Sequence, residues 1–339
     1  MNVRSETTID RSAAIREIER LHVTDDVYLR IEKRFSNHLD MMAAGAEASR
    51  AFVIAAESGA GKTHTISNLI AAKRFDVTTD EMGERRPLVC ITAPAPCTLK
   101  SLGLEIYEQM TGECLPVRTL EHDIWRRVRH TARVLGVEVL VIDEMHHLFD
   151  AKSDKNIAAV LATLKHLLVG EVPDERRHVS FRPITLVLSG MPTLKDVLAR
   201  DLQVQRRCIF ETIAADDTDA KSRKKQSKFL NLFNARLSEI MGEDQKIDDP
   251  EMMARLIEAS DSYRGRMCVL LKDAAKMAVM SGSRRIDRVE HLAVTFRERY
   301  EVDDANNPFL MADPSRYRRR YPIERDTMTK LIGRRGEPE

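Results

Sequence analysis

Short, continuous apolar runs alternate with helical patterns along the first two thirds of the chain. An apolar run of roughly four to eight residues, bounded by turn residues, is typical of a strand that a parallel sheet buries on both faces. Five such runs are present, at residues 51–56, 87–92, 137–142, 184–188 and 207–213. The pattern therefore predicts an α/β fold in which helices sandwich a parallel sheet.

Helical periodicity occupies much of the remaining sequence. Apolar residues recur three and four positions apart in the stretches 11–45, 62–73, 98–111, 118–135 and 228–300. Residues 214–228 change from acidic to basic and contain almost no apolar residue, so we place a domain boundary there. Four parts are expected: an N-terminal helical segment at 1–45, an α/β domain at 46–215, a small all-helical domain at 216–302 and a basic tail at 303–339.

Composition excludes several classes of protein. The chain of 339 residues carries 54 Lys and Arg against 53 Asp and Glu, so nucleic-acid contact would have to come from local patches. Its five cysteines are scattered and never form a CxxC pair, which argues against a disulfide scaffold and a cysteine-ligated zinc site. We find neither a signal peptide nor an apolar run long enough to span a bilayer. A cytoplasmic protein with no membrane partner is expected.

The loop after the first apolar run carries residues suited to phosphate binding. The segment Glu57-Ser-Gly-Ala-Gly-Lys-Thr63 follows a strand and opens a helix, which is the context of a P-loop. Its glycines let backbone N–H groups surround phosphates, while Lys62 would contact the β- and γ-phosphates and Thr63 would ligate Mg²⁺. The predicted ATP-binding residues are Glu57, Ser58, Gly59, Ala60, Gly61, Lys62, Thr63 and His64. Ala56 replaces the first glycine of the motif, and alanine is tolerated there only with a negative φ.

Adjacent carboxylates, Asp143 and Glu144, end the third apolar run, as in a Walker B element. Asp143 would hold Mg²⁺ with Thr63, and Glu144 would be catalytic by polarising the attacking water. An isolated Asp-Glu pair is more often a helix cap, but behind a P-loop it favours nucleotide hydrolysis. His146 and His147 follow at once. Because no third ligand stands at metal spacing, we interpret them as ordinary surface or core residues.

With these motifs, the chain resembles the TniB/TnsC-type AAA+ ATPases that regulate transposition. The resemblance spans about residues 28–300. Its most specific stretches are LGVEVLVIDE at 135–144, RDLQVQRR at 200–207 and SYRGRMCVLLKDAA at 262–275, with Asn307-Pro-Phe309 as a minor feature. It implies an AAA+ P-loop ATPase domain at 46–215, a helical lid domain at 216–302, and hydrolysis of ATP to ADP and phosphate with Mg²⁺.

The fourth strand departs from the family pattern at its end. Met191 stands where the family commonly has threonine, and methionine cannot bind a catalytic water. Either Ser189 or Thr193 would substitute, or hydrolysis is slow.

The resemblance also implies roles for arginines. Arg207 would be a catalytic arginine finger that reaches the ATP site of the neighbouring subunit, with Arg206 as the alternative. Arg266 would contact the γ-phosphate from the lid, with Arg264 as the alternative. An ordinary surface arginine is the competing interpretation in both places.

Contacts to double-stranded DNA are implied as well. Lys100 and Thr119 match positions at which the family binds the DNA backbone, and Arg118, Arg126 and Arg127 would extend the same stripe. The tail cluster, whose arginines are Arg316, Arg318, Arg319 and Arg320, would dock onto DNA, a transposase or a target-selector protein. Its competing interpretation is a solvated tail.

Three functions are weighed. In the first, which we expect, ATP drives a homo-oligomer, a ring or a helical filament, to form on target DNA; the oligomer recruits and activates a transposase, and hydrolysis disassembles it. The second is a helicase loader or another regulatory AAA+ ATPase that acts on a protein partner. An origin-recognition-like initiator is disfavoured, because only about 40 residues follow Tyr300. The third, a small-molecule kinase, is disfavoured by the acidic pair and the helical C-terminal part.

Overall fold

The chain divides into two compact units in the computed structural model, which describes residues 10–45, 50–81, 83–149, 154–169, 184–216 and 219–317. We call Thr24–Ala215 the sheet unit; the helical unit combines the residues up to Val23 with those from Asp216 onward. The N-terminal segment expected at 1–45 is divided between them. Helix α1 (Arg11–Arg20) belongs to the helical unit and α2 (Asp26–Ala43) to the sheet unit.

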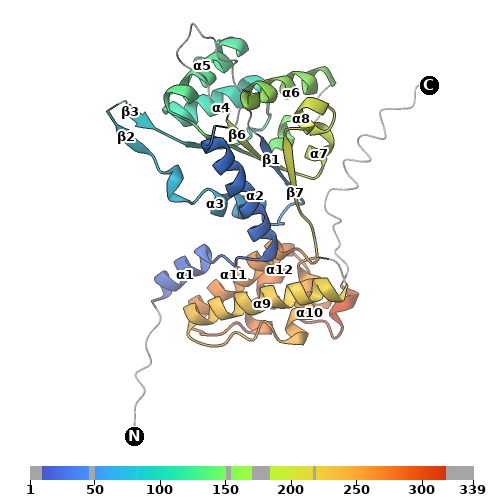
Figure 1. Ribbon diagram of the computed structural model, residues 1–339. Helices are drawn as coiled ribbons and strands as arrows, with labels where there is room; N and C mark the ends of the chain where they lie inside the picture. Colours follow the sequence, from blue (N-terminus) through green and yellow to red (C-terminus); the bar gives the residue numbers. More distant parts are fainter. Residues whose placement is uncertain are drawn as a thin grey trace, which may run out of the picture. The chain divides into compact units, whose positions relative to one another are not determined.

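A parallel five-stranded sheet forms the centre of the sheet unit (Figure 1). Its strand order is β4-β5-β6-β1-β7, with β1 hydrogen-bonded to β6 on one side and to β7 on the other. Each strand coincides closely with one predicted apolar run: β1 (Ala51–Ala56), β4 (Leu88–Thr92), β5 (Val139–Asp143), β6 (Thr185–Gly190) and β7 (Cys208–Ile213). The predicted α/β fold is confirmed.

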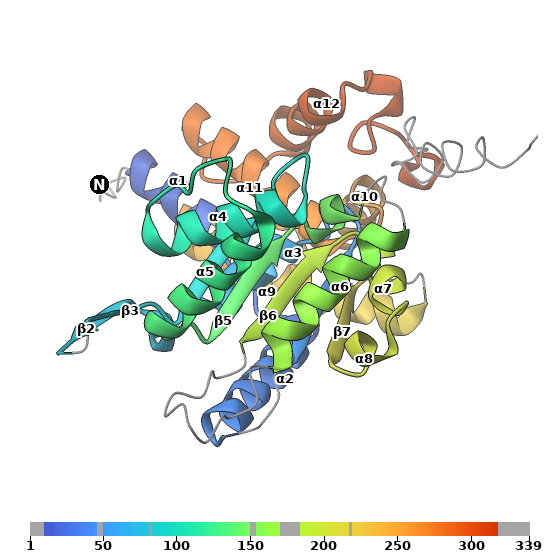
Figure 2. The ribbon, with the colours of Figure 1, turned by 90° about the horizontal axis from the view of Figure 1, so that it is seen from above.

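Alternation along the strands assigns each helix to one face of the sheet, since successive strand side chains point to opposite sides. Val53, Ile142 and Leu188 share a core with α4 (Leu99–Thr111), α5 (Glu121–Val134), α6 (Asp154–Val169), α7 (Thr193–Leu198) and α8 (Leu202–Gln205). Phe52 and Ile54 pack on the other side with α2 and α3 (Lys62–Leu69). Figure 2 shows strands β5, β6 and β7 with α4–α8 around them. Because both faces are covered, β1, β5 and β6 are buried along almost their whole length.

A small hairpin of the sheet unit was not predicted. Strands β2 (Thr78–Asp80) and β3 (Gly83–Arg85) pair antiparallel, and every residue in them is exposed (Figure 1). Since neither face packs on a core, the sequence has no apolar alternation that would indicate strands.

Helix α11 (Arg264–Ser281) forms the centre of the helical unit. Its Leu270, Leu271 and Ala275 are at most 1% exposed. The core around it draws on α1, α9 (Ala220–Met241), α10 (Pro250–Ala259), a π-helical turn (Arg288–Ala293) and α12 (Val294–Tyr300). Within the described residues, no helix combines the length and the apolar character needed to cross a membrane.

The Asn307-Pro-Phe309 segment closes this helical core. Asn307 donates from Nδ2 to the Ala293 carbonyl at 2.8 Å and accepts from the Phe309 amide at 3.1 Å. Buried Arg255 donates to the Pro308 carbonyl at 2.7 Å. Both Asn307 and Phe309 are 0% exposed, so in this chain the segment has a structural role.

Candidate nucleotide-binding site

The loop between β1 and α3 has the backbone of an anion-binding turn. Gly59 and Gly61 adopt φ values of 73° and 101°, a left-handed conformation that favours glycine. Gly61 is the N-cap of α3, and in this described segment no side chain caps the helix. The first N–H groups of α3 can therefore bind an anion, which the helix dipole also favours.

Ala56 fits the first P-loop position without strain. It ends β1, pairs in register with Ile213 of β7 and is 1% exposed. Its φ is not positive, and alanine is tolerated at this position of a P-loop only with a negative φ. The missing glycine therefore leaves the loop intact.

Lys62 folds its side chain back across the loop. Its Nζ donates to the Ala56 carbonyl at 2.9 Å and to the Glu57 carbonyl at 3.3 Å, and the residue is 5% exposed. A buried ammonium ion is stable only with such acceptors. The oxygens of a phosphate in the loop would offer it a charged acceptor, which binds more strongly than a carbonyl.

Asp143 joins three elements at the carboxyl edge of the sheet. Its Oδ2 accepts a 2.8 Å hydrogen bond from the Thr63 hydroxyl of α3, and its Oδ1 accepts from the Glu144 amide at 2.8 Å. The hydroxyl of Ser189, at the end of β6, donates to the same Oδ1. A hydroxyl beside a carboxylate is an oxygen donor set of the kind that Mg²⁺ prefers.

The end of β6 and the start of α7 carry the two candidate substitutes for the family's threonine at the position of Met191. Ser189 is 0% exposed and bonded to Asp143, whereas Met191 is half-buried and Thr193 is exposed at the start of α7. Of the two substitutes named from the sequence, the structure brings only Ser189 to the acidic pair. Nothing in the linear sequence marks that contact, because 46 residues separate the partners.

Glu144 leaves β5 in a left-handed conformation, with φ 53° and ψ 35°. A 3-10 turn, Met145–Leu148, follows it. Within this turn, Nδ1 of His146 lies 3.1 Å from Oε2 of Glu144. Sequence reasoning missed this proximity and treated the two histidines as unrelated to the acidic pair.

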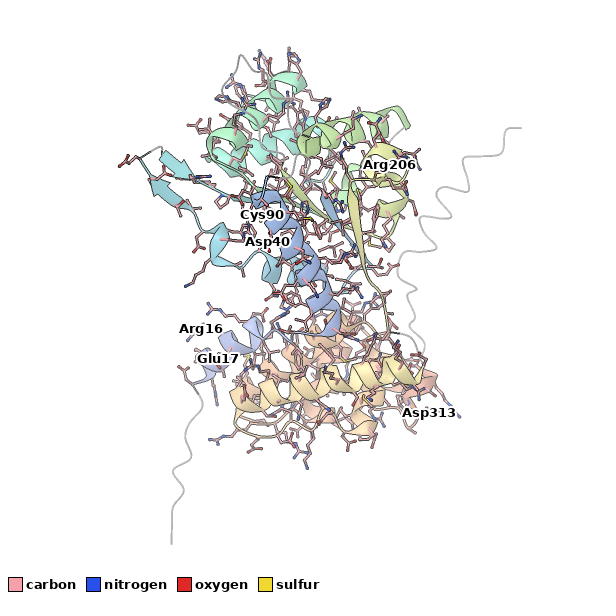
Figure 3. The ribbon with its side chains drawn as sticks, in the orientation of Figure 1. Arg16, Glu17, Asp40, Cys90, Arg206 and Asp313 are labelled. Carbon is pink, nitrogen blue, oxygen red and sulfur yellow. The ribbon has the colours of Figure 1, made fainter. Side chains whose placement is uncertain are left out.

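Arg207 lies where the strands begin, whereas the P-loop lies where β1 ends. Its carbonyl accepts from the Ala51 amide at 2.9 Å, so it is level with the start of β1, about 16 Å along the strand from Ala56. Its guanidinium donates to the Gln203 carbonyl at 3.2 Å. Arg206 is exposed beside α8 (Figure 3). Neither arginine is near the P-loop of its own sheet unit.

The two lid arginines lie in the helical unit and both have acidic partners. Arg266 donates to Asp261 at 2.6 Å, and its guanidinium lies 4.4 Å from the centre of the Tyr263 ring. Arg264 bonds Asp216 through two nitrogens, at 2.8 and 3.0 Å. Their roles toward a nucleotide stay predictions.

The predicted DNA contacts lie near the crossing of α4 and α5. Lys100 is half-buried in the first turn of α4, and Thr119 is half-buried in the turn before α5. A Cβ at Gly103 of α4 would be 2.8 Å from Ile124 of α5, so these helices touch within two turns of both residues. Arg118, Arg126 and Arg127 are exposed on the same hairpin.

The remaining predicted residues are placed as follows. Glu57 is half-buried, Ala60 is buried, and Ser58, Thr63 and His64 are exposed. In the tail, Arg316 is exposed beside Asp313, and Arg318, Arg319 and Arg320 lie outside the described residues.

Known families and structures show a similar arrangement. A family model described as an AAA domain matches residues 46–198. The chain is similar to ORC2 of Aeropyrum pernix, solved as ADPNP–ADP complexes, with 15% identity, a TM-score of 0.56, and coverage of 86% of this chain and 75% of that one. The chain is also similar to Cdc6p of Pyrobaculum aerophilum, with 15% identity, a TM-score of 0.53, and coverage of 84% of this chain and 70% of that one.

Drosophila ORC, solved bound to DNA, gives 14% identity, a TM-score of 0.53, and coverage of 88% and 68%. No curated protein sequence matches the chain. At these identities the structural likeness establishes the fold, and none of these four matches is described as TniB/TnsC-type. Residues 46–198 of this chain thus match an AAA domain model, and the sheet unit has the P-loop AAA+ fold seen in ORC and Cdc6 proteins.

Proposed function

We propose that this protein is an ATP-dependent, DNA-binding regulator of transposition. ATP would drive the assembly of an oligomer on target DNA, the oligomer would recruit a transposase, and hydrolysis would disassemble it. The observation that carries the ATPase part is the contact between Thr63 and Asp143 beside a P-loop with two left-handed glycines. It brings together the two oxygen donors that nucleotide hydrolysis requires.

Each residue at the carboxyl ends of these strands would have a separate role in ATP hydrolysis. Lys62 would bind the β- and γ-phosphate oxygens, and Thr63 and Asp143 would hold Mg²⁺, which supplies positive charge to the phosphates. Glu144 would orient the attacking water and accept its proton as the water oxygen bonds to the γ-phosphorus and the bond from the γ-phosphorus to ADP breaks. Ser189 would hold the Asp143 carboxylate in position.

Oligomerisation is supported by the place of Arg207. An arginine finger has to reach the γ-phosphate. Arg207 lies at the amino ends of the strands of its own sheet, away from the P-loop at the carboxyl end of β1. The geometry therefore suits action on a neighbouring subunit, which requires a head-to-tail interface of the kind that gives rings or filaments.

DNA binding is supported by the basic residues along α5 and the turn before it. Arg118, Arg126 and Arg127 are exposed, although Arg126 is paired with Asp123 at 2.7 Å. Residues 118–129 contain four arginines and two acidic residues, so this stretch carries a local excess of positive charge. Drosophila ORC, which has the same fold, was solved bound to DNA. The link to transposition itself rests on the sequence resemblance.

The runner-up is a regulatory ATPase that acts on a protein, such as a helicase loader. Its AAA+ parts would be the same, and likeness to ORC and Cdc6 proteins fits it equally well. The partner distinguishes the two functions. We expect the purified protein with ATP to retain a transposase from its own element; retention of a replicative helicase instead would favour the loader.

The first experiment measures fluorescence anisotropy of a labelled random-sequence duplex with no nucleotide, ADP, ATP or a non-hydrolysable analogue. We expect salt-sensitive binding with ATP or the analogue only. Lys62→Ala should abolish the nucleotide effect, whereas Lys73→Ala, which removes an exposed lysine of the same unit, should not. Arg127→Ala should lower the salt slope by about one, because one phosphate contact is lost. Equal binding in all four nucleotide states would refute the switch.

A further inference from the structure

Glu144, His146 and His147 bring three metal-ligating side chains together at the end of β5. One ligand atom from each residue lies within 4.8 Å of the other two. The two imidazole rings lie 4.3 Å apart between their centres, and Nδ1 of His146 is 3.1 Å from the Glu144 carboxylate. The third ligand that the histidine pair lacked in the sequence is therefore Glu144.

The backbone produces this cluster. The left-handed conformation of Glu144 turns the chain sharply, and the 3-10 turn is then anchored by Met145 and Leu148, which are both 0% exposed. Gly190 at the end of β6 gives His146 room, since a Cβ there would be 3.4 Å from Nδ1 and 3.2 Å from the amide of His146. All three residues are half-buried, and the side chains of His146 and Glu144 are 18% and 34% exposed.

The geometry points to a binding site for a borderline transition-metal ion, Zn²⁺ by its donor set, formed by Glu144, His146 and His147. Two imidazoles and one carboxylate are a known three-ligand set for zinc, with a further position left for water. Tetrahedral zinc places its ligand atoms about 3.4 Å apart. The observed separations are within 4.8 Å, so a closure of at most about 1.4 Å is needed, which side-chain rotations supply.

This zinc site differs from the magnesium position in its chemistry. Thr63 and Asp143 offer only oxygen, which suits Mg²⁺, whereas imidazole suits zinc. Zinc would also hold the carboxylate that the proposed function assigns to water activation. On that proposed function, zinc therefore inhibits hydrolysis without displacing ATP, because no predicted P-loop residue is among its ligands.

Direct binding tests the site without any assumption about activity. The full chain, free of nucleotide and Mg²⁺, is titrated with Zn²⁺ in competition with a chromogenic chelator, and with Co²⁺ as a spectroscopic probe. We expect one tight equivalent whose Co²⁺ spectrum shows nitrogen and oxygen ligands without thiolate charge-transfer bands. His146→Ala and His147→Ala should each weaken that equivalent by roughly tenfold or more.

Two variants control for other ligands. His122 is exposed on α5, and Cys114 is an exposed thiol. His122→Ala and Cys114→Ser should therefore leave the affinity for the one tightly bound metal ion unchanged. Burial raises the pKa of Cys90 to about 11 and that of Cys208 to about 12, so these two thiols compete poorly for the metal. Unchanged affinity in both cluster variants, or a thiolate spectrum, overturns the proposal.

The functional consequence has its own readout. ATP hydrolysis of each variant is measured with added Zn²⁺ and normalised to its own rate in the presence of a zinc-selective chelator. We expect the wild type to be inhibited and the His147→Ala variant to need at least roughly tenfold more zinc. If neither the wild type nor any variant hydrolyses ATP, the proposed function fails. The Co²⁺ spectrum still shows whether the metal site exists.

Discussion

His38 of α2 is a polar side chain inside the core of the sheet unit. It is 2% exposed, its Nε2 lies 3.2 Å from the Thr185 hydroxyl, and its ring packs 5.4 Å from that of Phe52. Burial, and secondarily the charge of Arg50, lowers the pKa of His38 to about 4. The imidazole is therefore neutral in the folded protein at pH values where an unfolded chain would protonate it.

This shift predicts a loss of stability in acid. Between the folded pKa of about 4 and the unfolded value near 6.5, the unfolded chain binds a proton that the folded chain does not, so stability falls as the pH is lowered through that window. The free energy of unfolding should drop by about 2 kcal/mol from pH 7 to pH 5. Urea unfolding at both pH values measures it.

Two variants make that measurement specific. His38→Gln should show a smaller pH dependence than the wild type, because the titrating group is gone, although its absolute stability is also lower. His122→Gln, at an exposed position, should keep the full dependence. If His38→Gln retains the whole slope, the buried imidazole is not its source.

Chemistry at the residue scale was readable wherever it is local in sequence. The P-loop from Glu57 to Thr63 is one continuous segment, so its glycines and its lysine could be assigned from the order of residues alone. The partners of Asp143 could not. Thr63 and Ser189 reach it from 80 and 46 residues away, and only the packing of α3 and β6 beside β5 brings them there.

At the element scale, a buried carboxylate holds α2 to the edge strand β7. Glu211 is 3% exposed and accepts from Arg30 Nε at 3.3 Å and from Arg34, one turn further along α2. Both arginines are about half exposed. Solvent around the two exposed guanidinium groups weakens each ion pair. The Glu211 carboxylate is shielded from water, so it depends on these arginines to compensate its charge.

Neutralising Glu211 should destabilise the sheet unit. Glu211→Gln keeps the shape but removes the charge that the two guanidiniums share, and we expect a loss of roughly 1–3 kcal/mol in urea unfolding. Glu84→Gln is the matched control. Its ion pair with Arg86 is exposed, so the loss should stay below about 0.5 kcal/mol. Equal losses in the two variants would contradict a special role for the buried pair.

Elements were predicted where burial leaves a pattern. All five apolar runs became strands because both faces of the sheet are covered. The β2–β3 hairpin was missed because it is exposed on both sides. The stretch 11–45, which the sequence indicated as helical, contains two helices, and the second starts where Asp25 accepts from the Tyr28 amide at 2.7 Å.

At the scale of the whole molecule, the sheet separates the P-loop from Arg207. The P-loop follows the carboxyl end of β1, and Arg207 lies level with its amino end. If the proposed ATPase uses both, they must come from different subunits. A mixing experiment tests this directly.

Lys62→Ala and Arg207→Ala should each abolish most hydrolysis alone, the second by on the order of 10³-fold. Mixed in equal amounts, they should recover activity, because a subunit with an intact Lys62 then meets a neighbour with an intact Arg207. Random assembly makes about a quarter of the interfaces competent. Phosphate release is the measurement, and no recovery at any ratio would rule out action between subunits.

The strands, the phosphate loop and the acidic pair could all be read from the order of residues, because each depends on residues that are neighbours in the chain. Packing in three dimensions was needed for the order of the strands, the division of the two N-terminal helices, and the contacts of Asp143 with Thr63 and Ser189. It also brought Glu144 beside His146, through a left-handed turn that no residue type at that position announces. The physical reason is that such contacts depend on how distant segments pack, and a linear pattern records only whether each segment is buried.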